Sequence, residues 1–157
     1  MRELVLLFVV LAVAAAAKIT PAEQCPDEHH VGLRERIKVI PCGKTRCKLR
    51  RGTNVTVHFQ FKTTREISEL KNTVWGEIAG VALPFPGVDQ ASVCGYVTSA
   101  EDGSPAPCPL EAGKEYVYVK QFPIEPYYPE TAVRVHWALN DGTSNVICFE
   151  APAVIIK

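Results

Sequence analysis

Six cysteines constrain the fold of this chain more than any other feature, because each bonded pair ties two parts of a small domain together. They are Cys25, Cys42, Cys47, Cys94, Cys108 and Cys148. An even number in a secreted chain of 157 residues predicts a framework of disulfides with no free thiol. Chain reach favours Cys42–Cys47 and Cys94–Cys108, each closing a turn-rich loop. Cys25–Cys148 is then left to join the two ends of the domain.

The N-terminal segment is what indicates secretion. Arg2 supplies a charge, 4–13 is apolar, and the four alanines of 14–17 suit cleavage, so residues 1–17 are predicted to be a signal peptide. The apolar run is shorter than the roughly 20 residues that span a bilayer. We expect residues 18–157 to form one secreted domain, with the lysosomal lumen as a further destination.

Metal binding and catalysis are both disfavoured. Zinc is the rival use for the cysteines, but no paired C-x-x-C occurs and His29-His30 falls on an expected loop. Paired cysteines leave no nucleophilic thiol, and no serine lies in G-x-S-x-G. His58 and His136 occupy the polar phase of alternating strands, where we expect solvated side chains. We therefore expect no enzyme, no cofactor and no metal site.

Short alternating segments predict an all-β fold. In 55–62 the apolar Val55, Val57, Phe59 and Phe61 alternate with polar residues, so Val57 is expected in the core. Further strands are expected at 36–40, 73–82, 115–120, 133–139, 146–149 and 153–156. Asn140-Asp141-Gly142 is a hairpin-turn signal. No segment sustains a period of 3.6, which indicates a two-sheet β-sandwich.

Two glycines and one tryptophan refine this prediction. Gly76 and Gly80, inside the expected strand 73–82, indicate bulges or points of close approach. An immunoglobulin domain with its Cys-Trp-Cys spacing is an alternative. Trp75 follows a basic stretch and a long strand, however, and the order of the cysteines fits that domain poorly.

Two proline-rich aromatic segments stand out between the strands. Phe85 lies between Pro84 and Pro86 in 81–87, and such a segment should be stiff, extended and poor at joining a sheet. Three prolines exclude a regular strand through 122–129. The two loops either face each other across the mouth of a cavity or simply close the ends of the sandwich.

Charge is concentrated in one place. The chain has 17 basic and 17 acidic residues, so nothing global points to nucleic acid. Five basic residues nevertheless fall within 44–51: Lys44, Arg46, Lys48, Arg50 and Arg51. They form either a solvated loop or a transient docking patch for an anionic membrane surface or an acidic partner. Asn54-Val55-Thr56 is the one glycosylation sequon.

The order of these motifs resembles the ML lipid-recognition family, in its sterol-transfer subtype. The matching features are Pro41-Cys42 with Cys47, Leu49 and Gly52; Pro84-Phe85-Pro86; Cys94; Cys108-Pro109-Leu110 with Gly113 and Tyr116; Pro123-Ile124; Tyr128-Pro129; Val133 to Trp137; and Asp141 to Cys148. The family pairs its cysteines first to sixth, second to third and fourth to fifth, which agrees with the pairing from chain reach.

The resemblance implies an immunoglobulin-like two-sheet sandwich with an internal lipid cavity. It implies a monomeric carrier that holds a sterol, hydroxyl toward the opening, and delivers it to membranes or to a membrane sterol transporter. The implied ligand-binding residues are Phe85, Ile124, Tyr128 and Pro129 at the mouth, and Val135, Trp137, Phe59 and Phe149 inside.

Three features depart from the family pattern, and other ligands remain open. The family's glycosylated asparagine lies further along the strand than Asn54, Phe149 replaces a common tryptophan, and the loop 95–107 is longer. Other family members bind microbial lipids such as lipopolysaccharide in innate immunity, or carry fatty acids and semiochemicals.

Overall fold

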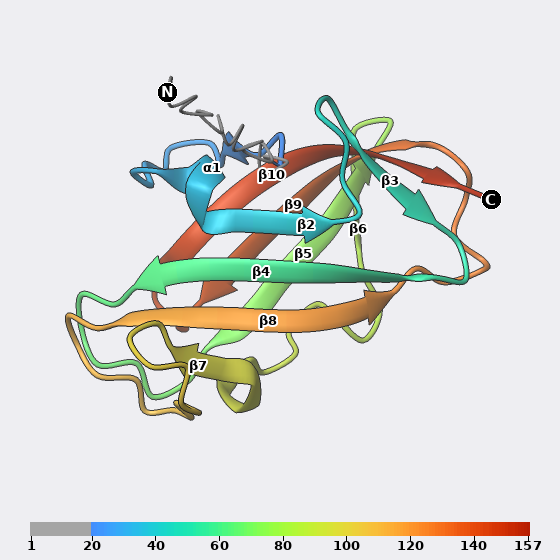
Figure 1. Cartoon of the computed structure of the whole chain (residues 1–157). Helices are drawn as coiled ribbons and strands as arrows, with labels where there is room; N and C mark the ends of the chain where they lie inside the picture. Colours follow the sequence, from blue (N-terminus) through green and yellow to red (C-terminus); the bar gives the residue numbers. More distant parts are fainter. Residues whose placement is uncertain (1–19) are drawn as a thin grey trace, which may run out of the picture.

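The computed structural model describes residues 20–157, which form two β-sheets packed face to face (Figure 1). The expected all-β, immunoglobulin-like sandwich is confirmed. The predicted signal peptide, residues 1–17, lies outside the described residues. Within 20–157, no helix has the length and apolar character needed to cross a membrane.

In the described part of the chain, ten strands make up the two sheets. The first sheet has the order β1 (Glu23–Gln24), β10 (Asn145–Ile156), β9 (Ala132–Asn140), β5 (Lys71–Ile78) and β6 (Val81–Pro84), and β3 (Cys47–Arg50) pairs in parallel with the end of β10. The second has the order β2 (Ile37–Ile40), β4 (Asn54–Lys62), β8 (Glu115–Pro123) and β7 (Val97–Ser99). Two short helical turns are added, α1 (Leu33–Arg36) and a 3-10 helix at Cys94–Tyr96.

Strand β4 shows why the sandwich has a core. All four apolar residues of its alternating pattern are buried, whereas the polar residues between them face the outer side of the sheet. Phe59, in the middle, has no exposed surface and contacts the rings of Tyr118, Trp137 and Phe149. The period of two therefore predicts this strand and its inward face.

The expected single strand at 73–82 is wrong, because the chain turns back within it. Ala79 and Gly80 both adopt positive φ, at 51° and 80°, and separate β5 from β6. The expectation that the segment before Phe85 would not join a sheet is also wrong. Val81–Pro84 forms β6, but as the edge strand of its sheet, where a proline removes no hydrogen bond that a neighbour needs.

The basic stretch was expected to be a loop, and half of it is a strand. Cys47 and Leu49 are buried while Lys48 and Arg50 are exposed, so β3 alternates like the other strands. Its basic residues hide that period in the sequence.

Pro152 does not interrupt β10, which runs unbroken through it. On one side of β10, pairing with β1 ends at Glu150 and pairing with β3 begins at Ala153. Pro152 lies between these two partners and opposite Arg134 of β9, so neither β1 nor β3 pairs with it.

The three disulfides are those expected: Cys25–Cys148, Cys42–Cys47 and Cys94–Cys108. Cys25–Cys148 spans 123 residues and fixes the loop after β1 to β10. In the chain-entropy model a loop of that length stabilises a fold by about 4–5 kcal/mol. The bond joins that loop to a strand of the first sheet, unlike the pair that joins the two sheets of an immunoglobulin domain.

Candidate ligand-binding cavity

An apolar cavity of about 50 Å³ lies between the two sheets. Val135 and Trp137 of β9 and Phe149 of β10 line it from the first sheet, and Val57 of β4 and Phe122 of β8 from the second. No charged or polar side chain lines it among the described residues. Such a wall suits an apolar ligand and offers no hydrogen bond to a polar group at depth.

The floor of the cavity is fixed by a buried polar network. The Nε1 of Trp137 donates a hydrogen bond of 2.9 Å to the side-chain oxygen of Asn72, whose amide nitrogen donates to the Tyr118 hydroxyl at 3.2 Å. Burial raises the pKa of that hydroxyl to about 12. Because the network satisfies the indole N–H, Trp137 presents only apolar surface to the cavity. Sequence reasoning missed Asn72, although a polar residue in the inward phase of a strand is a usable signal.

Phe85 and Tyr128 close the cavity at one end. Their rings meet edge to face with centroids 5.7 Å apart, and Tyr128 is buried while Phe85 is half-buried. Burial raises the pKa of the Tyr128 hydroxyl to about 12, and Tyr127 and Glu125 add to the shift. The two rings therefore pack on each other, and not on separate sides of an open mouth.

Backbone hydrogen bonds hold both closing segments. Phe85 donates its N–H to Val74 of β5 at 3.2 Å, and the Asp89 carboxylate accepts the N–H of Val74 at 2.8 Å. On the other side, Ile124 donates to the carbonyl of Thr53 at 2.8 Å. The stiffness expected from the prolines is thus reinforced by bonds to neighbouring strands.

A second apolar space of about 180 Å³ lies on the outer side of Phe85. It is lined by Gly76, Leu83, Pro84, Tyr128, Pro129 and Val133, among others; we call it the outer cleft. Phe85 lines both spaces and separates them. The expected close approach at Gly76 is confirmed, since a Cβ there would lie 2.7 Å from Val133 and 3.3 Å from the ring of Phe85.

The implied ligand residues divide between these spaces. Phe85, Ile124, Val135, Trp137 and Phe149 line the inner cavity, and Tyr128 and Pro129 line the outer cleft. Phe59 lies behind the wall, with its ring 5.4 Å from that of Trp137 and 5.1 Å from that of Phe149. Val57, expected in the core, is fully buried and also lines the cavity.

The basic residues are not equivalent. Lys44, Arg46, Lys48 and Arg50 are exposed on β3 and the loop before it; we call them the basic strand patch. Arg51 is instead ion-paired with Glu130 and donates to the carbonyl of Tyr128 at 3.4 Å. It ties the closing segment to the end of β3.

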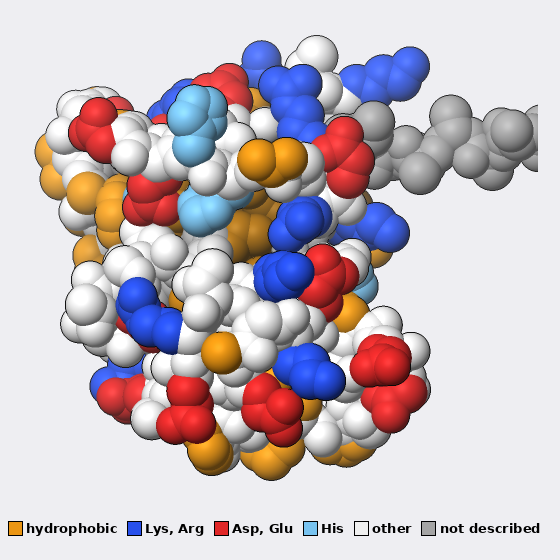
Figure 2. Space-filling model, turned by 90° about the vertical axis from the view of Figure 1, so that its left-hand side faces the viewer, with side chains coloured by type: hydrophobic (Ala, Val, Ile, Leu, Met, Phe, Trp, Pro, Cys, Tyr) orange, Lys and Arg blue, Asp and Glu red, His pale blue; other side chains and the backbone are white. Residues whose placement is uncertain are grey.

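The opposite end of the sandwich has a different surface. Figure 2 views the molecule from the left of Figure 1, away from the loop that follows β8, and basic, acidic and histidine side chains are interspersed on that face. Asn54 lies instead at the end with the closing segments, exposed at the start of β4 and opposite Pro123 of β8.

The two strand histidines are less solvated than expected. His136 is buried at 8% exposure, so its expected solvated position is wrong, because Trp75 of the neighbouring β5 stacks on its ring. His58 is half-buried, and burial, followed by the charge of Lys38, lowers its pKa.

Comparison with known proteins agrees with this geometry. The bovine (Bos taurus) NPC intracellular cholesterol transporter 2 is 31% identical over 153 residues, covering 97% of each chain. The Drosophila melanogaster NPC intracellular cholesterol transporter 2 homolog a is 30% identical, over 94% of this chain and 97% of the relative. The crystal structure of a Niemann-Pick type C2 protein from Japanese carpenter ant has a TM-score of 0.64 at 21% identity, covering 76% of this chain and 89% of that one.

A family model described as ML domain matches residues 20–155, which is nearly all of the described chain. With its two-sheet sandwich, its three disulfides and its apolar cavity between the sheets, this protein belongs to the ML domain family.

Proposed function

We propose that this protein is a lipid carrier that holds a sterol in the cavity between its sheets and transfers it to membranes. The observation that carries the proposal is the wholly apolar lining of that cavity, closed by two aromatic rings at one end. The bovine relative's name, NPC intracellular cholesterol transporter 2, supports a sterol as the ligand class.

The lining determines how the ligand lies. A sterol is apolar apart from one hydroxyl, and the inner wall offers that hydroxyl no partner. Burying an unpaired hydroxyl costs about 1–3 kcal/mol in proteins. The hydroxyl therefore lies at the Phe85–Tyr128 end, and the hydrocarbon tail points toward Trp137.

Uptake requires the cavity to expand. Pockets that hold drug-sized ligands measure about 300–1,000 Å³, against about 50 Å³ for the inner cavity. Movement of the Phe85 ring would join the inner cavity to the outer cleft of about 180 Å³. Phe85 and Tyr128 thus form the gate, and Ile124 and Pro129 border it.

The expected affinity suits a carrier. A sterol that buries about 500 Å² of apolar surface gains roughly 12 kcal/mol at 25 cal/mol per Å². Loss of translational and rotational freedom, with the cost of opening the gate, takes back several kcal/mol. The remainder corresponds to dissociation constants between about micromolar and nanomolar, which allow both loading and release.

Delivery uses the basic strand patch. Leu49 and Cys47 of β3 line the inner cavity, so the exposed cations of the same strand lie close to it. Each basic residue near an anionic membrane contributes on the order of 1 kcal/mol, which favours transient docking. We further propose that the carrier is a secreted or lysosomal monomer, that it carries a glycan on the exposed Asn54, and that a membrane sterol transporter is an alternative acceptor.

The test is a competitive binding panel with cholesterol, a fatty acid and lipopolysaccharide, together with mass spectrometry of co-purified lipid. Cholesterol should compete most strongly and be found in the purified protein. Tighter binding of lipopolysaccharide would reassign the protein to microbial lipid recognition, and tighter binding of the fatty acid to the carriage of fatty acids or semiochemicals. Binding of none of them would refute the carrier function.

A further inference from the structure

A cleft of about 320 Å³ lies at the end of the sandwich away from the gate. Strand β4 runs from Asn54, beside the closing segments, to Lys62 in the cleft. Figure 2 looks onto this end, where hydrophobic atoms lie recessed beneath histidine, lysine and arginine side chains. No residue of this cleft lines the inner cavity or the outer cleft, so the sterol carrier proposed above does not use it. We call it the basic cleft, and its lining includes Arg36, Phe61, Lys62, Arg65, Asp141 and Asn145.

Three cations line the basic cleft, against the single carboxylate of Asp141. That carboxylate is already satisfied: its Oδ2 is paired with Arg65, and its Oδ1 accepts two backbone N–H groups of the following turn, each at 2.9 Å. The Arg65 side chain is nevertheless 50% exposed. Within residues 20–157, Arg36 and Lys62 have no ion-pair partner. The cleft therefore keeps positive charge that the fold does not neutralise, which attracts an anion.

The floor of the basic cleft is apolar. Phe61 of β4, Ile147 of β10 and Ile67 all line it and are buried. At the edge, the Ser144 hydroxyl accepts a hydrogen bond from Arg65 at 2.9 Å, so its own hydrogen is available to a ligand oxygen. A ligand that fits this lining has an anionic group for the rim and a carbon body for the floor.

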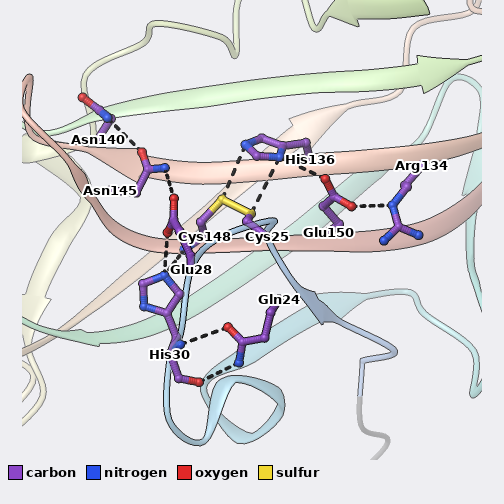
Figure 3. Close-up of a disulfide and its surroundings, with 10 residues drawn as sticks. All are labelled: Gln24, Cys25, Glu28, His30, Arg134, His136, Asn140, Asn145, Cys148 and Glu150. Carbon is purple, nitrogen blue, oxygen red and sulfur yellow. Dashed lines mark hydrogen bonds and ion pairs between the residues drawn. A yellow bond between two sulfur atoms is a disulfide. The ribbon is translucent and has the colours of Figure 1, made fainter. Parts of the chain in front are cut away.

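The histidine side of the basic cleft is held in place by bonds on both sides of the loop. The Gln24 side chain bonds the backbone of His30 twice, at 2.8 and 3.0 Å, and Asn145 of β10 donates to Glu28 at 2.6 Å (Figure 3). The Cys25–Cys148 disulfide fixes the start of the same loop. Glu28 does not line the cleft, and its two carboxylate oxygens face Asn145 and His30. The site is therefore formed in the free protein, which lowers the cost of ordering it on binding.

We propose that the basic cleft binds the phosphate monoester of a small polyol, such as a sugar phosphate or the glycerol phosphate headgroup of a lipid. Histidines aside, its lining has an excess of two positive charges. A phosphate monoester carries about 1.5–2 negative charges at pH 7, whereas a carboxylate carries only one. Arginine offers paired donors that match phosphate oxygens, and Lys62 adds a further charge. The polyol lies on the apolar floor, and the volume of about 320 Å³ is typical of small-molecule sites.

The test is isothermal titration of the purified protein, with its disulfides intact and at low salt. The probes are glucose-6-phosphate, glycerol-3-phosphate, inorganic phosphate and glucose. We expect one site per chain for an ester, bound more tightly than inorganic phosphate because only the ester covers the floor, and weakened by added salt. Tighter binding of glucose-6-phosphate identifies a sugar phosphate as the source of the group, and tighter binding of glycerol-3-phosphate a lipid headgroup. No saturable binding of either ester, or glucose bound as tightly as its phosphate, would overturn the proposal.

Two variants separate this site from general attraction of anions to the protein. Lys62→Gln and Arg36→Gln should each weaken binding of the ester by about fivefold to tenfold, through loss of a charge-assisted hydrogen bond. Lys62 is exposed, so its variant should keep the melting temperature and decides the matter alone if Arg36→Gln is destabilised. Lys120→Gln is the matched control, because Lys120 lies on the same sheet, over the ring of Tyr96 and outside the cleft. Unchanged affinity in Lys62→Gln, or an equal loss in Lys120→Gln, would rule the site out.

Discussion

Truncation of Phe85 distinguishes a gate from a structural plug. A fully buried Phe→Ala change typically costs about 3–5 kcal/mol of stability. Phe85 is half-buried, with the outer cleft on one side and the inner cavity on the other, so it packs on only part of its surface. We expect Phe85→Ala to destabilise the ligand-free protein by about 1–1.5 kcal/mol, or about 4–6 °C in melting temperature for a domain of this size.

The matched control is the same substitution at a position away from both spaces. Phe61 is 1% exposed, packs near Tyr116 and lines neither the inner cavity nor the outer cleft. Phe61→Ala should therefore cost the full 3–5 kcal/mol, approximately. Val57→Ala is a poor control because Val57 lines the cavity, so its truncation alters stability and binding together.

The effect on ligand binding should run the other way. Sterol at about 100 times its dissociation constant stabilises the unaltered protein by about 2.7 kcal/mol. If the Phe85 ring covers about 50 Å² of ligand, its loss removes about 1.3 kcal/mol of binding, or roughly tenfold in affinity. The same sterol concentration would then stabilise Phe85→Ala by only about 1.4 kcal/mol. Phe61→Ala should keep the whole ligand-induced shift.

The assay is thermal unfolding of each variant with and without sterol. The gate is supported if Phe85→Ala loses little stability but about half of the ligand-induced shift. If Phe85→Ala melts as early as Phe61→Ala and retains the shift, Phe85 is a plug, and the assignment of the gate is wrong.

Three further predictions concern the gate, the patch and the buried histidine. Gly76→Ala should displace the Phe85 ring, because the added Cβ would lie 3.3 Å from that ring and 2.7 Å from Val133. We expect faster sterol release in stopped-flow fluorescence, and an unchanged release rate would contradict the role of Phe85 as a gate. Reversing the charges of the basic strand patch should slow transfer to anionic vesicles, leave equilibrium affinity unchanged and be mimicked by salt; equal wild-type rates to neutral and anionic vesicles would remove the case for docking. Burial lowers the pKa of His136 below 6.5 in the folded protein, against the opposing effect of Glu150. The unfolded chain therefore binds the proton more readily, and the stability of the fold should decrease as the pH drops below about 6.5. The melting temperature of His136→Gln should depend less on pH in that range, and an equally steep dependence would contradict this assignment.

Local patterns were sufficient to predict much of the framework. The short loops between Cys42 and Cys47 and between Cys94 and Cys108 limit where those sulfurs can reach, and the structure pairs them as expected. The alternation in β4 predicts its inward face, because successive side chains of a strand point to opposite sides. The prolines around Phe85 predicted a stiff aromatic segment, which lies at one end of the cavity.

The same patterns failed where a neighbouring strand decides the outcome. β3 carries its period of two beneath basic side chains, and only its pairing with β10 makes it a strand. β6 tolerates Pro84 because it is an edge strand, and Pro152 of β10 lies between the residues that pair with β1 and those that pair with β3. Which edge lacks a partner is a property of the sheet, not of any one segment.

The sequence alone determined the all-β sandwich, the two short-range disulfides and the presence of two stiff aromatic segments, since each depends on chain reach or on alternation within a few residues. The third disulfide, Cys25–Cys148, followed only because its two cysteines were left over. Only the tertiary structure decided the size of the cavity, the contact between Phe85 and Tyr128, and the burial of His136. Alternation says which face of a sheet a side chain occupies, but not what covers that face. For His136 the cover is Trp75 from the next strand and a disulfide that joins positions 123 residues apart, and both are set by strand order and register.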